Sequence, residues 1–147
     1  MTPMDLALEE ARAAAARGEV PVGAVLLDPL GGVLAQAGNR TEADHDASAH
    51  AELLVLRAGG RLLQSPRLTG CTLVVTLEPC PMCAGALVAA RVSRVVFAAP
   101  DPKAGACGSL YNLCGDPRLN HELAVTRGVL RQEASALLSA WFAAKRL

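Results

Sequence analysis

The stretch Cys71–Ala90, CTLVVTLEPCPMCAGALVAA, changes its pattern halfway along and indicates how the chain folds. Its first part, Cys71–Leu77, is rich in β-branched residues, which favours a buried strand. The segment Pro79–Pro81 then marks the start of a helix. Pro81 suits the first turn because the N–H that proline lacks has no partner inside the helix at that position. The stretch therefore predicts a strand that passes directly into a helix.

The same alternation extends in both directions along the chain. We expect further strands at Val20–Leu27, Val33–Ala37, Val92–Ala99 and Val125–Leu130. We expect helices at Met4–Arg17, Ala49–Leu63, Pro81–Ala90 and Glu133–Lys145, with Gly18 ending the first and Gly59 and Gly60 disturbing the end of the second. Asp28–Gly32 reads as the loop of a hairpin, and the segment from Pro100 to Asn120 reads as loop. This order predicts an α/β protein with three α/β/α layers, whose mixed or parallel sheet is covered on both faces.

Length and composition set limits on the class of protein. A chain of 147 residues is the size of one ordinary domain, so we expect residues 1–147 to form a single domain. Hydrophobic residues make up 52% and charged residues 19%, which excludes a disordered chain. With 14 basic and 14 acidic residues, the net charge of zero excludes a histone-like binder of nucleic acid. The four aromatic residues are too few for a multi-base stacking platform.

The sequence also favours a cytoplasmic protein with no membrane span. Its longest apolar runs, Val22–Leu27 and Ala84–Ala90, are far shorter than the roughly 18 residues that cross a bilayer. The first residues include Asp5, Glu9 and Glu10 and do not resemble a signal peptide. Five cysteines without a secretory signal are typical of a reducing compartment, where they serve as metal ligands or core residues.

Two short segments, His50–Glu52 and Glu78–Cys83, carry metal-ligand chemistry. Cys80 and Cys83 stand three positions apart, a spacing at which one helical turn can bring two thiolates to a single zinc ion. The positive end of the helix dipole also favours thiolates. A neutral imidazole from His50 would be the third ligand. One zinc per chain would then keep a coordination position for water, as catalytic zinc sites do.

Glu52 is the candidate proton shuttle of this site. Side chains two positions apart point away from each other in a regular helix. At a helix start, however, His50 is not yet on the regular helix face, so both side chains can approach the metal. Glu52 is therefore expected to move protons between water and substrate without being a ligand.

Each of these features also has a simpler interpretation. A Cys-x-x-Cys pair alone is often structural zinc or a redox pair. His45 and His50 together with Cys80 and Cys83 would complete a closed Cys₂His₂ site. Glu52 alone would be a solvated helix residue. The combination of both segments is more specific and favours catalytic zinc. The remaining cysteines, Cys71, Cys107 and Cys114, are interpreted as small core or loop residues.

The chain resembles the zinc-dependent nucleobase deaminase superfamily and, within it, the bacterial tRNA-specific adenosine deaminases. The resemblance covers nearly the whole sequence. It is carried by Glu19–Val25, Gly38–Arg40, His45–Asp46, His50–Glu52, Thr76–Ala86, Asp101–Gly105, Gly108–Leu110 and Asn120–His121. The zinc motifs belong to the whole superfamily, whereas the stretches around Asn39, Asp101 and Asn120 point to tRNA.

This resemblance implies a cytidine deaminase-like fold, with a five-stranded mixed sheet flanked by helices, and a homodimer whose active sites lie near the subunit interface. It implies the hydrolytic conversion of adenosine to inosine at the wobble position of an arginine tRNA, so the partner would be the tRNA anticodon loop. His50, Cys80 and Cys83 match the zinc ligands and Glu52 the proton shuttle. The positions that match contacts to the flipped base or the anticodon loop are Asn39, Asp101, Lys103 and Asn120.

Two other functions remain open from the sequence. A free-base or nucleotide deaminase, acting on guanine or cytosine, would share the four zinc-site residues but would close its pocket to a polymer. A tRNA enzyme needs a basic rim, for which the candidates are Arg40, Arg67, Arg91, Arg94 and Lys103. A non-catalytic zinc module that binds RNA would not need Glu52. The basic end Lys145–Arg146 is short, so we expect it to contribute less to RNA binding than the basic tail of some relatives.

Overall fold

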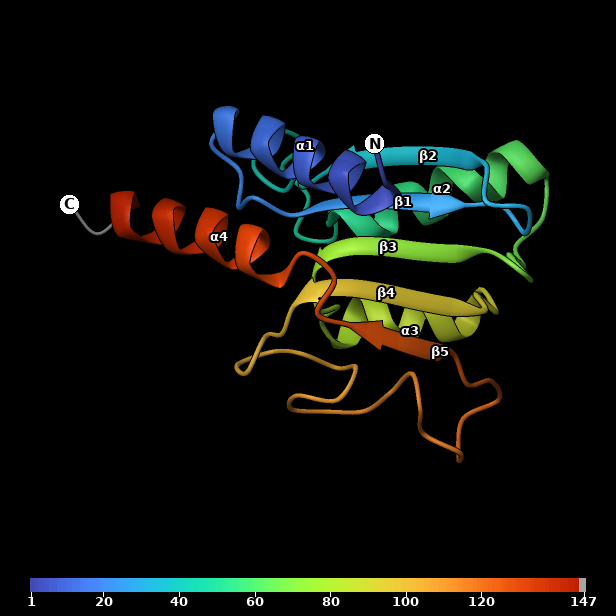
Figure 1. The fold of residues 1–147 in the computed structure, drawn as a ribbon. Helices are drawn as coiled ribbons and strands as arrows, with labels where there is room; N and C mark the ends of the chain where they lie inside the picture. Colours follow the sequence, from blue (N-terminus) through green and yellow to red (C-terminus); the bar gives the residue numbers. More distant parts are fainter. Residues whose placement is uncertain (146–147) are drawn as a thin grey trace.

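The computed structural model describes residues 1–145; Arg146, part of the short basic end, lies outside them. A five-stranded sheet has the order β2-β1-β3-β4-β5 (Figure 1). Its strands are β1 (Gly23–Leu27), β2 (Val33–Gly38), β3 (Thr72–Leu77), β4 (Arg94–Ala99) and β5 (Ala124–Arg127). The β1 strand is antiparallel to β2 and β3, whereas β3, β4 and β5 are parallel. The expected mixed sheet is confirmed.

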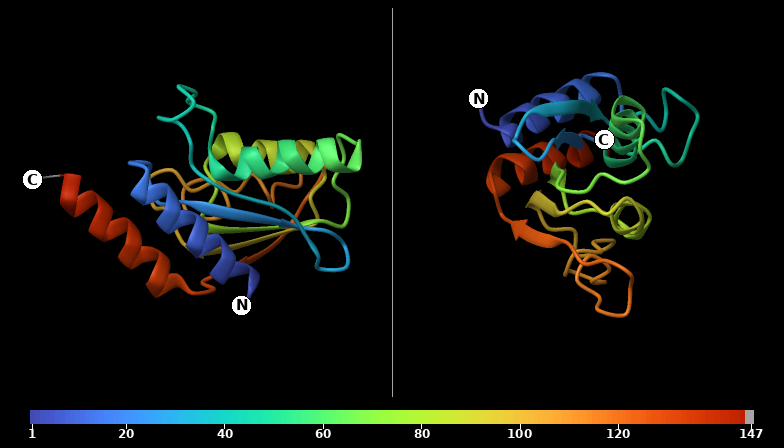
Figure 2. Two further views of the ribbon diagram at one scale, coloured as in Figure 1. Left: turned by 90° about the horizontal axis from the view of Figure 1, so that it is seen from above. Right: turned by 90° about the vertical axis from the view of Figure 1, so that its right-hand side faces the viewer.

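Helices cover both faces of the sheet (Figure 2). On one face lie α1 (Pro3–Ala16) and α4 (Arg131–Lys145), and on the other lie α2 (Ala51–Leu63) and α3 (Pro81–Ala89). A buried apolar cluster fills each interlayer space: Leu26, Val75 and Leu87 belong to the α2–α3 side, and Val25 and Val74 to the α1–α4 side. The expected three-layer α/β/α fold is confirmed. None of the helices within residues 1–145 is long and apolar enough to span a membrane.

Two local expectations need correction. Gly59 and Gly60 do not disturb α2, which continues regularly to Leu63. A Cβ atom at Gly59 would lie 2.3 Å from Leu26 Cδ2, so glycine lets α2 pack closely on β1. The bounds of three strands also differ from the expected ones: the first strand begins at Gly23 instead of Val20, the fourth begins at Arg94 instead of Val92, and the last ends at Arg127 instead of Leu130.

Other local expectations are confirmed. Gly18 follows the end of α1 with a φ of 88°, a backbone conformation that suits glycine. The hairpin loop closes through a bond from Asp28 N to Gly32 O of 2.8 Å. The remaining cysteines, Cys71, Cys107 and Cys114, are fully buried as small core residues.

The topology gathers the motif residues at one end of the sheet. Because β3 and β4 are parallel, the residues that follow them, Glu78 and Asp101, lie at the same end of the sheet, beyond the C-terminal ends of these strands. The α3 helix begins beside Glu78, and α2 begins next to α3 at His50. Segments far apart in sequence therefore meet at this end of the sheet.

A candidate metal centre and its cavity

His50 is the residue immediately before α2, with extended backbone angles φ −73° and ψ 147°. Its side chain does not cap the helix. The first N–H of α2, that of Ala51, instead donates to Asn39 Oδ1 at 2.9 Å. The imidazole is therefore left free for another partner.

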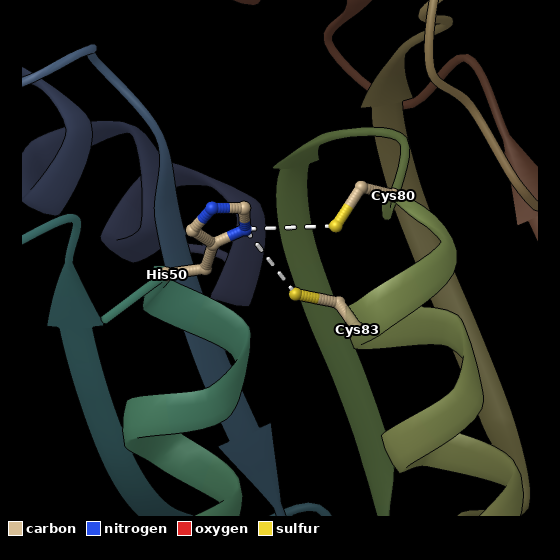
Figure 3. A group of neighbouring side chains, drawn as sticks. All are labelled: His50, Cys80 and Cys83. Atoms are coloured by element: carbon tan, nitrogen blue, oxygen red, sulfur yellow. Dashed lines mark hydrogen bonds between the residues drawn. The ribbon is translucent and has the colours of Figure 1, made fainter. Parts of the chain in front are cut away.

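Cys80 holds the equivalent position before α3, and Pro81 is the first helical residue, as expected. His50 Nδ1 lies 3.6 Å from Cys80 Sγ and 3.5 Å from Cys83 Sγ (Figure 3). A tetrahedral zinc with Zn–N of about 2.0 Å and Zn–S of about 2.3 Å would place these atoms about 3.5 Å apart. The donor set and its spacing therefore fit one zinc ion.

The group contains three protein donors within 4.8 Å of one another. His45, needed for the closed Cys₂His₂ alternative, lies outside it on an exposed turn. The geometry thus agrees with the open, three-ligand arrangement predicted from the sequence, and residues 1–145 place no fourth His, Cys, Asp or Glu ligand in the group.

The two thiols lie within 4.8 Å of each other, and their proximity shifts their acidities in opposite directions. The neighbouring Cys83 lowers the pKa of Cys80 to about 4, and the contact with His50 adds to this effect. The same interaction between the two thiols, together with burial, raises the pKa of Cys83. The group therefore offers one ready thiolate, and the second thiol releases its proton when a cation binds.

Glu52 lies in the first turn of α2 and is only 4% exposed. Burial raises the pKa of its carboxyl group. A raised pKa brings proton exchange closer to neutral pH, which suits a residue that accepts and returns protons. Glu52 lines the same cavity as His50 and Cys80.

The cavity has a volume of about 260 Å³. This value lies near the lower end for small-molecule pockets, about 300 Å³, so the cavity suits one small ring system. Its apolar lining is Val20, Val22, Leu77 and Ala104, and its polar lining is Asn39, Thr41, His50, Glu52, Glu78, Cys80 and Asp101.

Two of the four predicted substrate residues line this cavity. Asn39 is buried, and its Oδ1 is engaged by Ala51 N, which leaves its amide nitrogen for the cavity. Asp101 follows β4 and shapes the loop after it: its Oδ1 accepts from Lys103 N at 3.0 Å and from Ala104 N at 3.2 Å. Asn39 and Asp101 thus reach the same cavity from two different segments, one after β2 and one after β4.

The other two, Lys103 and Asn120, are exposed and do not line the cavity. Lys103 lies two residues beyond Asp101 on the same loop. Asn120 lies beside His121, whose Nε2 is 2.7 Å from Val92 O. Val92 precedes β4 and Asp101 follows it. Within one subunit, Asn120 therefore lies near the start of β4, at the opposite end of the strand from Asp101.

The candidate basic residues do not form one continuous rim within a single chain. Arg40 pairs with Asp44 at 3.1 Å. Arg94 stands at the start of β4, away from the cavity, and donates to Thr126 Oγ1. Arg40 and Lys103 are the two candidates that stand directly beside cavity-lining residues in sequence, and of these Lys103 has no salt bridge within residues 1–145.

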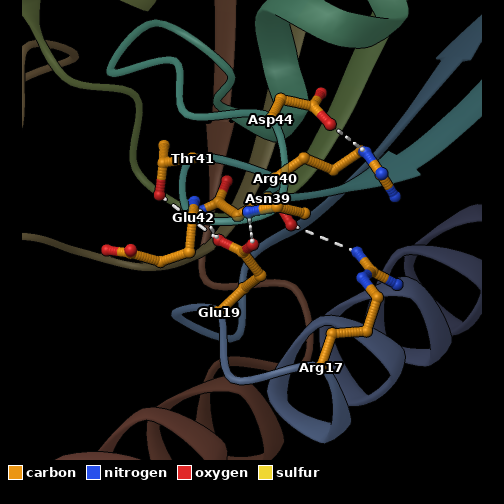
Figure 4. Close-up of polar contacts among 8 residues, drawn as sticks. Arg17, Glu19, Asn39, Arg40, Thr41, Glu42 and Asp44 are labelled. Atoms are coloured by element: carbon orange, nitrogen blue, oxygen red, sulfur yellow. Dashed lines mark hydrogen bonds and ion pairs between the residues drawn. The ribbon is translucent and has the colours of Figure 1, made fainter.

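Two buried acids, Glu19 and Glu78, were not among the predicted site residues and are 1% and 2% exposed. Glu19 accepts bonds from Glu42 N at 3.1 Å, Ala43 N at 2.8 Å and Thr41 Oγ1 at 3.3 Å (Figure 4). Burial alone would raise the pKa of Glu19, but these hydrogen bonds outweigh burial and lower it. The usable signal was an acid directly next to an apolar run, since Val20 follows Glu19 and Leu77 precedes Glu78.

Comparisons with known proteins agree with this site. Residues 2–99 match the family described as cytidine and deoxycytidylate deaminase zinc-binding region. A tRNA-specific adenosine deaminase of Bacillus subtilis is 50% identical over 139 residues, which span 95% of this chain and 86% of that protein. A structure from a study of A-to-I editing by tRNA:A34 deaminases at the wobble position of transfer RNA is 45% identical, with a TM-score of 0.89 over 92% of this chain and 98% of that one.

A structure of guanine deaminase from Nitrosomonas europaea is more distant in sequence. It is 29% identical, with a TM-score of 0.83 over 96% of this chain and 83% of that one. The fold is therefore shared by deaminases of different bases, while the sequence lies nearer to the tRNA enzymes. This chain belongs to the zinc-binding cytidine and deoxycytidylate deaminase family and, within it, to the tRNA-specific adenosine deaminases.

Proposed function

We propose that the protein converts adenosine to inosine and ammonia by hydrolysis at the wobble position of a tRNA anticodon, with an arginine tRNA as substrate. The observation that carries the catalytic part is the buried carboxyl group of Glu52 beside the His50–Cys80–Cys83 group. A non-catalytic zinc module has no use for an acid in that place. The higher identity to tRNA deaminases than to guanine deaminase supports the substrate.

The target base enters the cavity after leaving the stack of the anticodon loop. Flipping a base from a single-stranded loop costs only a few kcal/mol. The cavity has room for one such base, so the neighbouring nucleotides stay outside, within reach of exposed residues such as Lys103. The side-chain amide nitrogen of Asn39 and the loop that starts at Asp101, which both line the cavity, orient the base in the proposed complex.

Zinc held by His50, Cys80 and Cys83 would supply a Lewis acid that makes water a nucleophile near neutral pH. In the proposed reaction, Glu52 accepts a proton from the attacking water and delivers it to N1 of adenine. Glu52 then assists the departure of the amino group from C6 as ammonia. The buried position of its carboxyl group keeps bulk water from competing for these protons.

We further propose a homodimer that covers α3. Every residue of this helix is apolar, which normally indicates a helix buried on all sides. Nevertheless Pro81, Met82, Gly85 and Ala89 are exposed, and a groove of about 660 Å³ runs between α2 and α3. Since α3 starts directly after Cys80, a second copy on this surface would lie next to the active site.

We also propose that residues 1–147 act as one deaminase domain in the cytoplasm. One sheet uses strands from residue 23 to residue 127, and α1 and α4 pack on the same face of it. All five cysteines are free thiols, in keeping with a reducing compartment.

Mass analysis of the substrate after incubation with the protein tests the reaction. An arginine tRNA anticodon stem-loop with adenosine at the wobble position is compared with free adenosine, guanine and cytosine at equal concentration. We expect inosine in the stem-loop and essentially no conversion of the free compounds. Turnover of guanine or cytosine that equals or exceeds that of the loop would favour the free-base deaminase instead. Stem-loops of other tRNAs test the arginine specificity.

A further inference from the structure

Glu78 is a buried acid whose carboxylate accepts hydrogen bonds from a single loop. Within residues 1–145 it forms no salt bridge with a basic side chain. Oε1 accepts from Asp101 N at 3.0 Å and also from Ser109 Oγ. Oε2 accepts from Cys107 N and from Ser109 N, each at 3.0 Å. All four donors belong to the loop Asp101–Ser109.

This loop depends on Glu78 because it has little secondary structure of its own. Between Pro100 and Asn120 the only strand-like pairing is the isolated bridge of Cys107 with Asn112. N–H groups outside helices and strands that are shielded from water need other acceptors, and the carboxylate of Glu78 accepts from one buried and two partly buried N–H groups of this loop. A further bond, from Ala106 N to Pro79 O at 2.8 Å, fixes the same loop to the neighbouring residue.

Gly105 brings the loop into direct contact with the carboxylate. A Cβ atom at this position would lie 2.4 Å from Glu78 Cδ and 2.5 Å from Asp101 O. Only glycine allows this approach. The loop is therefore built around the carboxylate of Glu78.

The contact joins two parts of the active site. Glu78 stands two residues before Cys80, so its backbone is continuous with the start of the metal-binding helix. The loop supplies Asp101 and Ala104 to the cavity wall. The position of that wall relative to the metal group therefore depends on Glu78.

We propose that Glu78 is a positioning residue that holds the loop Asp101–Ser109 at the distance from the metal group at which the loop meets the substrate base. It acts through the loop and touches no reacting atom. The positioning role rests on the proposed function. It is separate from metal binding, because Glu78 is not one of the three metal donors.

The test compares Glu78→Gln, Ser109→Ala and a matched control, Val25→Ala. An amide in place of the carboxylate loses acceptor capacity for the four donors, whereas Ser109→Ala removes only the hydroxyl donor. Val25 is fully buried in the core on the α1–α4 face, so its truncation lowers stability without touching the loop. Each variant is measured for zinc content, melting temperature, kcat and KM, and for the Kd of a fluorescent arginine anticodon stem-loop by anisotropy.

We expect Glu78→Gln to keep one zinc per chain and to raise KM and Kd at least tenfold, with a smaller change in kcat. Ser109→Ala should also raise KM and Kd, but by a smaller factor. Because this variant keeps the carboxylate, it still tests the proposal if Glu78→Gln folds poorly. Val25→Ala should lower the melting temperature and leave KM and Kd unchanged.

Two results would overturn the positioning role. The first is a Glu78→Gln protein that melts earlier but binds the stem-loop as tightly as Val25→Ala, together with an unchanged Kd for Ser109→Ala. The second is loss of zinc from Glu78→Gln before any change in Kd, which would assign the residue to the metal group. In both cases conversion of the stem-loop by the unmodified protein leaves the proposed function intact. Absence of that conversion would remove the proposed function, and the positioning role with it.

Discussion

His50 and Glu52 line the same cavity although only one residue separates them. Side chains two positions apart on a regular α-helix differ in direction by about 200°. His50 avoids this separation because its backbone is extended and the helix starts at Ala51. A His-x-Glu segment can therefore present a metal ligand and a proton carrier together at a helix start, and would not do so in the middle of a helix.

Replacing His50 tests the ligand set. We expect His50→Ala to lose most of the zinc, because two thiolates alone hold the metal weakly, and His45→Ala to retain one zinc per chain. The zinc content of the two variants after dialysis is measured by mass spectrometry. Equal loss of zinc from both variants would restore the closed site with four protein ligands.

Glu52→Ala separates proton transfer from metal binding. Since Glu52 is not a proposed ligand, the variant should fold and keep its zinc. Its turnover of the anticodon stem-loop should fall by about 10²–10⁴, the usual contribution of a general acid–base group. An active Glu52→Ala protein with full zinc content would contradict the shuttle role.

Lys103→Ala tests contact with the RNA backbone. Lys103 is exposed, and no salt bridge engages it within the described part of the chain. Each lost contact with a single-stranded phosphate reduces the slope of log K against log salt concentration by about 0.7. We expect weaker binding and a flatter salt dependence, with unchanged zinc content. An unaltered slope would place Lys103 outside the RNA contact.

Gly85→Glu tests the proposed dimer surface on α3. No atom lies within 4 Å of a Cβ at Gly85, so the subunit itself has room for the new side chain. A charge in the centre of an interface would separate the two copies, and light scattering should then report about half the mass of the unmodified protein. Gly85→Ala is the control, because it adds only an uncharged methyl group at the same position and should leave the dimer intact. A Gly85→Glu protein that remains dimeric would place the interface elsewhere.

Glu19→Gln should show a pH-dependent loss of stability. The pKa of Glu19 is lowered in the folded protein, so its ionised carboxylate stabilises the fold above its ordinary pKa of about 4.5. That contribution disappears as the pH falls through the folded pKa. Urea unfolding should therefore show a difference of about 1–3 kcal/mol between the two proteins at pH 7. The difference should shrink below pH 4.5, and a constant difference from pH 7 to pH 3 would contradict this account.

The two halves of the metal group were predictable because each half is local in sequence. Pro81 fixes the start of α3, and that start places Cys80 and Cys83 on one turn. His50 and Glu52 needed one further assumption, that a helix begins between these two residues. The order of strands and helices followed equally from local patterns of apolar and β-branched residues.

Features that depend on distant partners were not predictable in the same way. The donors to Glu78 lie 23 to 31 residues later and are mainly backbone groups, which have no sequence signature. Gly59 reads locally as a helix breaker, whereas its actual neighbour is Leu26 on β1. Asn120 lies near the start of β4 because β5 pairs in parallel with that strand, a choice that the sequence pattern leaves open.

The three metal donors are divided between two helices, and His50 and Cys80 are 30 positions apart. An unfolded chain keeps the two thiols close together but not the imidazole, so full affinity for zinc arises only after α2 and α3 have docked on the same face of the sheet. A ligand that binds only the folded state stabilises it by mass action. A bound zinc ion would consequently hold the two helices together, and the melting temperature of the protein should rise as the free zinc concentration is raised.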